Sequence, residues 1–159
     1  MLSPETESCL LETFLKSDGG AEWSLAHVSS ADQMAGFIEQ MIRDMRSLRF
    51  SDRDLFATRL AVEEALVNAL KHGHGFNTSE AVTIRYSLTS DRIIIEVEDQ
   101  GPGFQPSEVP DPTLAENLER SSGRGILLMR SFMNMVRFNE RGNRVTLCKF
   151  SSARRSQAN

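Results

Sequence analysis

Two pairs of apolar runs, each joined by a short polar turn, constrain the fold of this chain more than any other feature. Residues 81–88 (AVTIRYSL) and 92–99 (RIIIEVED) flank the turn TSD, and residues 136–140 (VRFNE) and 144–150 (RVTLCKF) flank RGN. Runs of this length, rich in β-branched residues and separated by a few turn-forming residues, are typical of β-hairpins. We therefore expect antiparallel strands in the middle and at the end of the chain.

Helical patterns lie between and before these hairpins. Residues 22–28 (EWSLAHV) predict a strand, after which Ser29 or Ser30 can cap a helix. That helix carries large apolar residues at spacings of three and four, which we expect in the core: Met34, Phe37, Ile38, Met41, Ile42 and Met45. The motif SDRD from Ser51 resembles a capping motif and opens a second helix that extends to about His72.

Two more helical patterns, TLAENLER (113–120) and RGILLMRSFMNMV (124–136), follow the first hairpin. Because helices and antiparallel hairpins occur in separate groups, the sequence favours an α+β, two-layer α/β sandwich with a mixed, mainly antiparallel sheet over a doubly wound parallel sheet. We expect one domain over residues 21–150. An N-terminal extension of unknown role (1–20) precedes it, and a disordered tail (151–159) follows.

The composition fits one globular domain in a reducing compartment. With 159 residues, 40% of them hydrophobic, the chain is long enough to bury one continuous core. The formal net charge of -4 argues against a nucleic-acid binder that relies on bulk positive charge. Cys9 and Cys148 are too few and too far apart for a disulfide framework or a cysteine zinc site, so a cytoplasmic setting is the simplest.

The sequence gives no sign of a membrane span or of export. No apolar run reaches the roughly 18 residues that a membrane helix requires. The first 20 residues contain acids where a signal peptide has basic residues, and their apolar run extends only from Cys9 to Leu11. We therefore expect no membrane partner.

The second predicted helix contains the first motif that suggests chemistry, EEALVNALKHG. Glu64 and Asn68 are four residues apart, so their side chains share one face of the helix, and His72 continues that row. An amide oxygen is a good ligand for Mg²⁺, and a carboxylate one turn away can hold a water or accept a proton from a hydroxyl. Taken alone, the row is also compatible with a polar stripe on a half-exposed helix.

The second motif is VEDQGPGF, in which Asp99 ends a predicted strand. A carboxylate at this position can accept hydrogen bonds from an exocyclic amine and a neighbouring water, which distinguishes adenine from guanine. Gly101 and Gly103 would let the chain turn sharply beside a flat ring. An Asp-x-Gly-x-Gly sequence is equally an ordinary turn.

The third motif, SSGRGILLM, is a glycine loop that enters a helix. Backbone N–H groups at a helix N-terminus can bind phosphate when Gly123 and Gly125 leave them unobstructed, and Arg124 or Arg120 could add positive charge. The alternative is a simple capped helix start. The sequence contains no Walker A loop, and no third glycine completes a dinucleotide fingerprint.

In this order, followed by a closing hairpin, the motifs resemble those of the GHKL ATPase superfamily, whose nucleotide-binding domain has the Bergerat fold. Within it the chain is most similar to the bacterial anti-sigma factor serine-protein kinases of stress-response and sporulation switches. EEALVNALKHG matches their N box, VEDQGPGF their first glycine box, and LERSSGRGILLMRSFMNMVRF their second box with the following helix and strand. The resemblance covers about residues 21–150.

The resemblance implies a role for each motif. Asn68 would bind the Mg²⁺ that bridges the ATP phosphates, and Glu64 would act as general base toward a serine hydroxyl or orient the attacking group. Asp99 would accept a hydrogen bond from the adenine amino group. The remaining residues would shape the adenine pocket or line the phosphates within a lid of about residues 105–125: Gly101, Gly103, Gly123, Arg124 and Gly125. Phosphoryl transfer mainly needs positioning and charge neutralisation, so these parts form a sufficient set.

The implied function is that of an ATP-dependent serine-protein kinase and anti-sigma factor that takes part in transcription regulation. Such a protein sequesters a sigma factor and phosphorylates a STAS-type anti-anti-sigma antagonist. It forms a homodimer in the cytoplasm and has no direct contact with nucleic acid. One departure concerns the last hairpin, where the family often carries Thr just after its glycine, whereas this chain has Gly142, Asn143 and Arg144. This departure bears on a secondary contact near adenine.

Two other functions fit the same fold. One is a nucleotide-binding, partner-switching module without significant kinase turnover, although a pure binder would not need a base at Glu64. The other is a stand-alone histidine-kinase-like catalytic domain, but no sensor or dimerisation-helix segment precedes the domain in this sequence. The longer GHKL machines need a transducer domain that 159 residues cannot contain.

Overall fold

The computed structural model describes residues 12–13, 21–73, 80–103, 105 and 123–155, without the side chains of 72–73 and 154–155. Its elements run in the order β1 (Trp23–Val28), α2 (Ala31–Ser47), α3 (Asp52–Asn68), a π-helical turn (Ala69–Gly73), β2 (Val82–Leu88), β3 (Arg92–Glu98), α4 (Arg124–Phe132), β4 (Met135–Phe138), β5 (Arg144–Phe150) and α5 (Ser152–Arg155). The strands and helices predicted within these ranges are confirmed, except that the helix predicted over 124–136 ends at Phe132 and its last residues belong to β4. The helix predicted at 113–120 lies outside the described residues.

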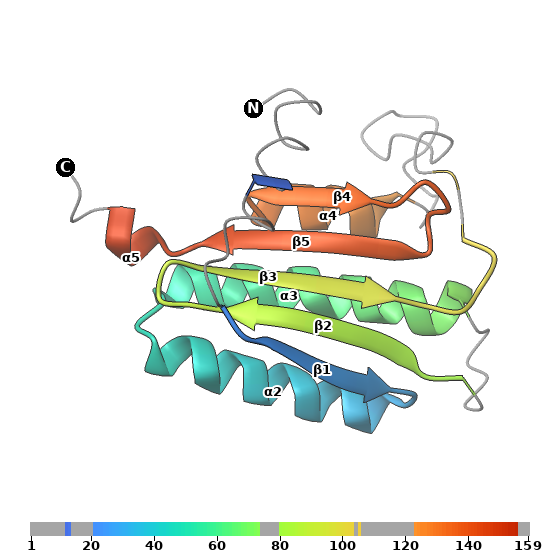
Figure 1. The fold of residues 1–159 in the computed structure, drawn as a ribbon, viewed down its shortest axis with the longest axis horizontal. Helices are drawn as coiled ribbons and strands as arrows, with labels where there is room; N and C mark the ends of the chain where they lie inside the picture. The colour runs from blue at the N-terminus through green and yellow to red at the C-terminus, as the bar shows by residue number, and fades with distance from the viewer. Residues whose placement is uncertain (1–11, 14–20, 74–79, 104, 106–122, 156–159) are drawn as a thin grey trace.

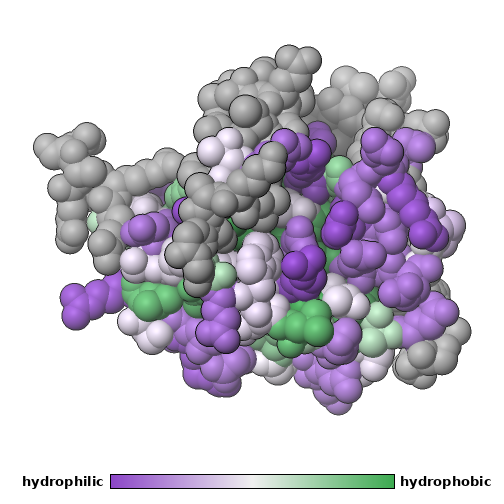
Figure 2. Space-filling model, in the orientation of Figure 1, coloured by the Kyte–Doolittle hydropathy of each residue, from purple (hydrophilic) through white to green (hydrophobic). Residues whose placement is uncertain are grey.

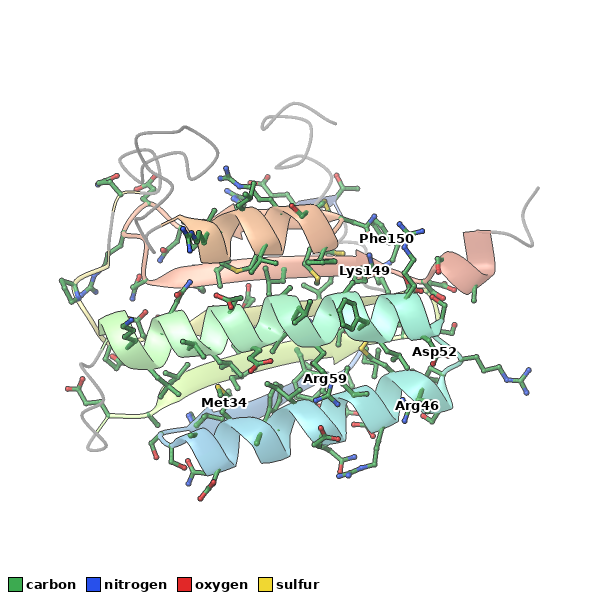
Figure 3. All side chains as sticks on the ribbon, turned by 180° about the vertical axis from the view of Figure 1, so that it is seen from behind. Met34, Arg46, Asp52, Arg59, Lys149 and Phe150 are labelled. Atoms are coloured by element: carbon green, nitrogen blue, oxygen red, sulfur yellow. The ribbon has the colours of Figure 1, made fainter. Side chains whose placement is uncertain are left out.

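The five strands form one sheet in the order β1-β2-β3-β5-β4, and α2, α3 and α4 pack side by side on one of its faces (Figure 1; Figure 3, from behind). This arrangement confirms the predicted α+β two-layer sandwich. A mixed, mainly antiparallel sheet was predicted. All four strand pairings among the described residues are antiparallel. Both hairpins, β2–β3 and β4–β5, form as the two pairs of apolar runs predicted.

The core lies between the helices and the sheet. Alternate residues of β3 point to the helix layer and are fully buried, as a period of two requires: Ile93, Ile95 and Val97. The apolar stripe predicted for α2 faces them, with Ile38, Met41, Ile42 and Met45 buried, and Met34 and Phe37 packed against the cluster. On the outer surface, Arg59 of α3 pairs with Glu39 of α2 at 2.7 Å (Arg59 is labelled in Figure 3), and the hydrogen bond from Arg59 lowers the pKa of Glu39.

Both predicted helix caps are present. The Ser30 hydroxyl accepts a hydrogen bond from the Gln33 N–H, and the Ser51 hydroxyl accepts one from the Asp54 N–H, each at 3.2 Å. These bonds satisfy backbone donors that the first turn of a helix leaves without an intrahelical partner. Both helices therefore begin at the serine caps that the sequence predicted.

A disordered tail was predicted from residue 151, but Ser152 is hydrogen-bonded to α3. Ser152–Arg155 forms the short helix α5, and the backbone N–H and hydroxyl of Ser152 donate to the Asp54 carboxylate at 2.9 and 2.8 Å. The Ser152 hydroxyl also lies 2.8 Å from that of Ser51. A buried acid in the first turn of α3 thus holds the end of the sheet, a contact that tail composition alone does not indicate. Residues 156–159 lie outside the described range.

The ends of several elements meet on one side of the molecule. The C-terminal end of α3, the end of β3, the β4–β5 turn and the start of α4 all lie to the right in Figure 1. Hydrophilic residues gather over the right-hand part of the sheet face turned to the viewer in Figure 2. Within the described residues, none of the helices is both long and apolar enough to cross a lipid bilayer.

Candidate active site

Glu64 and Asn68 lie in the last two turns of α3, and both are half-buried. Ala61 and Ala65, which are 0% and 3% exposed, flank this pair on the same side of the helix. The acid and the amide therefore stand at the margin between core and solvent, and not on a fully solvated stripe. The helix changes to a π-helical turn directly after Asn68, a distortion that often accompanies functional sites.

The first turn of α4 is placed against this pair of side chains. A Cβ atom built on Gly125 would lie 2.8 Å from Glu64 Oε2 and 3.1 Å from Asn68 Nδ2. Contacts this short would force the acid or the amide to move, so the absence of a side chain at Gly125 leaves both groups where they lie. The structure thereby brings the first and third sequence motifs together at one place.

Gly123 begins α4 in a conformation that favours glycine. Its φ of 90° is in the left-handed region, and it offers no side chain to cap the first turn of the helix. N–H groups in such a first turn point away from the helix and are suited to an anion. Arg124, between the two glycines, is exposed. The predicted phosphate-binding residues thus lie beside Glu64 and Asn68.

Asp99 follows β3 directly and is half-buried. Its Oδ1 accepts a hydrogen bond from the Gly101 N–H at 2.8 Å, which closes a tight Asx turn. Gly103 has a φ of 77°, and a Cβ atom there would collide with the backbone carbonyl of Arg141. Both glycines of the second motif therefore serve the geometry of a bend that starts at the acid.

The partner of this bend is the β4–β5 turn, which was not predicted as part of the site. Asn143, only 6% exposed, donates from Nδ2 to the Asp99 carbonyl at 2.9 Å, while its own carbonyl accepts from the Asp99 N–H at 3.0 Å. The GNR sequence in the turn was noted only as a departure from the family pattern. A buried asparagine in a hairpin turn was the available signal, because such a group must find hydrogen-bond partners.

Comparison with known proteins agrees with this arrangement. Residues 27–149 match the histidine kinase-like ATPase domain. The chain belongs to this family. It is 36% identical to the anti-sigma F factor of Clostridium perfringens strain SM101 over 96 residues, which cover 58% of this chain and 68% of that protein. The predicted resemblance to anti-sigma factor kinases of the GHKL type is confirmed.

Two further relatives are named as kinases. The serine-protein kinase RsbW of Bacillus licheniformis is 30% identical over 115 residues, which cover 67% of this chain and 71% of the relative. The serine/threonine-protein kinase BtrW of Bordetella bronchiseptica is 27% identical over 135 residues, which cover 82% of this chain and 92% of the relative. The similarity to kinases thus extends over most of both chains.

Proposed function

We propose that this protein is an ATP-dependent serine-protein kinase and anti-sigma factor, which sequesters a sigma factor and phosphorylates a STAS-type anti-anti-sigma protein. The observation that carries the proposal is the position of Gly125, where even a Cβ atom would collide with Glu64 and crowd Asn68. It joins a candidate base and a candidate metal ligand to the helix start suited to phosphate. The names of the relatives, anti-sigma F factor and serine-protein kinase, support the same function.

The chain's own residues divide the work of phosphoryl transfer. Asp99 accepts a hydrogen bond from the adenine amino group, while Gly101 and Gly103 shape the bend beside the ring. Gly123, Arg124 and Gly125 line the phosphates at the start of α4. Glu64 accepts the proton of the serine hydroxyl as its oxygen attacks the γ-phosphorus, and the bond from phosphorus to the ADP leaving oxygen breaks. The result is phosphoserine and ADP.

The donor atoms near Gly125 fit Mg²⁺. Among the described residues no group of three or more His, Cys, Asp or Glu side chains could hold a metal ion by itself. Mg²⁺ that is already bound to nucleotide phosphates needs only one or two oxygen ligands from the protein. The side-chain oxygen of Asn68, with Glu64 beside it, is a ligand of this kind. When bound, the ion would neutralise phosphate charge.

Calorimetry with ATP is the first test. We expect the protein to bind ATP only with Mg²⁺, and Asn68→Ala to weaken that binding about tenfold or more, the effect of losing roughly 1.4 kcal/mol. Gln40→Ala, which removes an exposed amide on α2, is the matched control and should leave binding unchanged. Absence of ATP binding under every condition would reject the kinase and leave a partner-binding module.

The assembly proposed here is a cytoplasmic homodimer that also holds the sigma factor. Light scattering at high protein concentration should give twice the mass of one chain. In gel filtration the protein should co-elute with the purified sigma factor when no other protein is added. A mass of one chain at every concentration would refute the dimer without affecting the nucleotide site.

A further inference from the structure

The bend that carries Asp99 rests on the β4–β5 turn through several hydrogen bonds. Asn143 holds the main chain of Asp99 from both sides, at its N–H and at its carbonyl. Arg141 donates from Nη2 to the Gly101 carbonyl at 3.0 Å. The collision that a side chain at Gly103 would make with Arg141 shows that the two segments are in backbone contact. The bend is thus supported along its length by one turn.

Asn143 is itself held in one orientation. Its Oδ1 accepts from Asn139 Nδ2 at 2.8 Å, and its N–H donates to Asn139 Oδ1 at 3.1 Å. The Arg144 N–H shares that same Asn139 oxygen at 3.1 Å. With its oxygen facing an NH2 group and its nitrogen facing a carbonyl, the Asn143 amide can lie only one way round. Neither Asp nor Leu could make both bonds.

We infer that Asn143 is a positioning residue, which sets the direction of the Asp99 carboxylate toward adenine through the Asp99 main chain. The inference rests on the proposed function, because it assigns adenine recognition to Asp99. Asn143 itself does not contact the nucleotide. Its hydrogen bonds hold Asp99, whose side chain contacts adenine, and Asn139 holds Asn143 in turn. The GNR turn thereby has a role in base recognition that its sequence alone did not suggest.

The test compares ATP with purine riboside triphosphate, which is ATP without its 6-amino group. Asn143→Asp keeps the size of the side chain but replaces the donor to the Asp99 carbonyl with an acceptor. We expect it to weaken ATP binding about tenfold in calorimetry, because one buried hydrogen bond is lost and the carboxylate of Asp99 is displaced. Binding of purine riboside triphosphate should change less than about twofold, since that ligand gains nothing from Asp99.

A structural defect would affect both ligands equally, and that result would overturn the inference. Should Asn143→Asp not fold, Arg141→Met removes the donor to the Gly101 carbonyl from an exposed position. It should weaken the binding of ATP about threefold more than the binding of purine riboside triphosphate. Arg53→Met, exposed on the first turn of α3 at the other end of the molecule, is the control and should alter neither.

The proposed function and the positioning role of Asn143 can be rejected by different results. If the unmodified protein binds neither triphosphate, the proposed function is wrong. If it prefers ATP to the analogue and Asp99→Asn removes that preference, Asp99 reads adenine. Should the preference nevertheless survive both Asn143→Asp and Arg141→Met, the turn does not position Asp99 and the inference is wrong.

Discussion

At the scale of single residues, Glu64 decides whether the site transfers phosphate or only binds nucleotide. Glu64→Gln keeps the shape of the side chain but cannot accept a proton. We expect ATP affinity within about threefold of the unmodified protein, and serine phosphorylation of the STAS partner slower by about 10² to 10⁴, the usual contribution of a general base. Radiolabelled ATP and calorimetry measure the two effects separately.

The neighbouring acid provides the control for that experiment. Glu63→Gln makes the same chemical change one position earlier on α3, where the side chain is exposed. It should leave both binding and transfer unchanged. Normal transfer by Glu64→Gln would remove Glu64 from the role of base and favour a module that binds nucleotide without turnover.

Substitution of Gly125 should affect phosphate transfer more than the stability of the fold. Gly125→Ala would place a methyl group 2.8 Å from Glu64 Oε2 and 3.1 Å from Asn68 Nδ2. Both neighbours are ends of side chains that can turn aside, so the free energy of unfolding should change by less than about 1 kcal/mol, with alanine's helix propensity offsetting part of the cost. The displaced acid and amide should reduce phosphate transfer at least about tenfold.

Gly36→Ala on α2 is the matched substitution, because a Cβ atom there would meet nothing within 4 Å. It should raise the free energy of unfolding by about 0.5–1 kcal/mol and leave transfer unaltered. Thermal unfolding and the kinase assay on both variants check the pair. Full activity of Gly125→Ala would show that the close approach is not needed in the working enzyme.

At the scale of elements, α3 is fixed at its N-terminal end by the buried carboxylate of Asp54. Burial opposes ionisation of Asp54, but hydrogen bonds from the backbone and hydroxyl of Ser152, the contact with Ser51 and the charge of Lys149 outweigh it and lower the pKa below 3.8. The folded state therefore favours the charged form. This stabilisation is fully present above about pH 4, the unfolded value, and is lost as the pH falls through the lower folded pKa.

Asp54→Asn tests that linkage through unfolding by urea between pH 7 and pH 2.5. We expect a loss of about 1–3 kcal/mol at pH 7, because a charged acceptor of the Ser152 bonds is removed, and a shallower decline in acid. Asp52→Asn, an exposed acid in the same turn (Figure 3), should cost only about 0.3–1 kcal/mol through the helix dipole. Equal pH profiles for the unmodified protein and Asp54→Asn would contradict the assignment.

Elements were predictable where local chemistry decides them. The caps at Ser30 and Ser51, the period of the α2 stripe and the turns of both hairpins depend on residues close together in the chain, and all are confirmed. Asp54 and Ser152 are 98 residues apart in the chain, so no local sequence pattern could predict that α5 is held by α3. The same holds for Asn143 and Asp99, whose bond depends on β5 lying next to β3.

At the scale of the whole molecule, the candidate nucleotide site uses the ends of separate elements: α3, β3, α4 and, through Asn143, β5. A ligand that contacts several elements binds only when all are folded together, so it should stabilise the domain as one unit. At a concentration of Mg²⁺-ATP about 100 times its Kd, the gain is roughly 2.7 kcal/mol. For a chain of this size we expect a rise in Tm of about 5–10 °C.

Differential scanning calorimetry with ATP and GTP at equal concentrations measures this effect and its dependence on Asp99. GTP should raise the Tm by less than about 2 °C, because guanine presents a carbonyl where Asp99 requires an amine donor. Asp99→Asn should reduce the ATP shift toward the GTP value while its own Tm without nucleotide stays close to that of the unmodified protein. Equal shifts with ATP and GTP would show that the nucleotide is held by its phosphates alone, and would separate the phosphate site at α4 from any reading of the base.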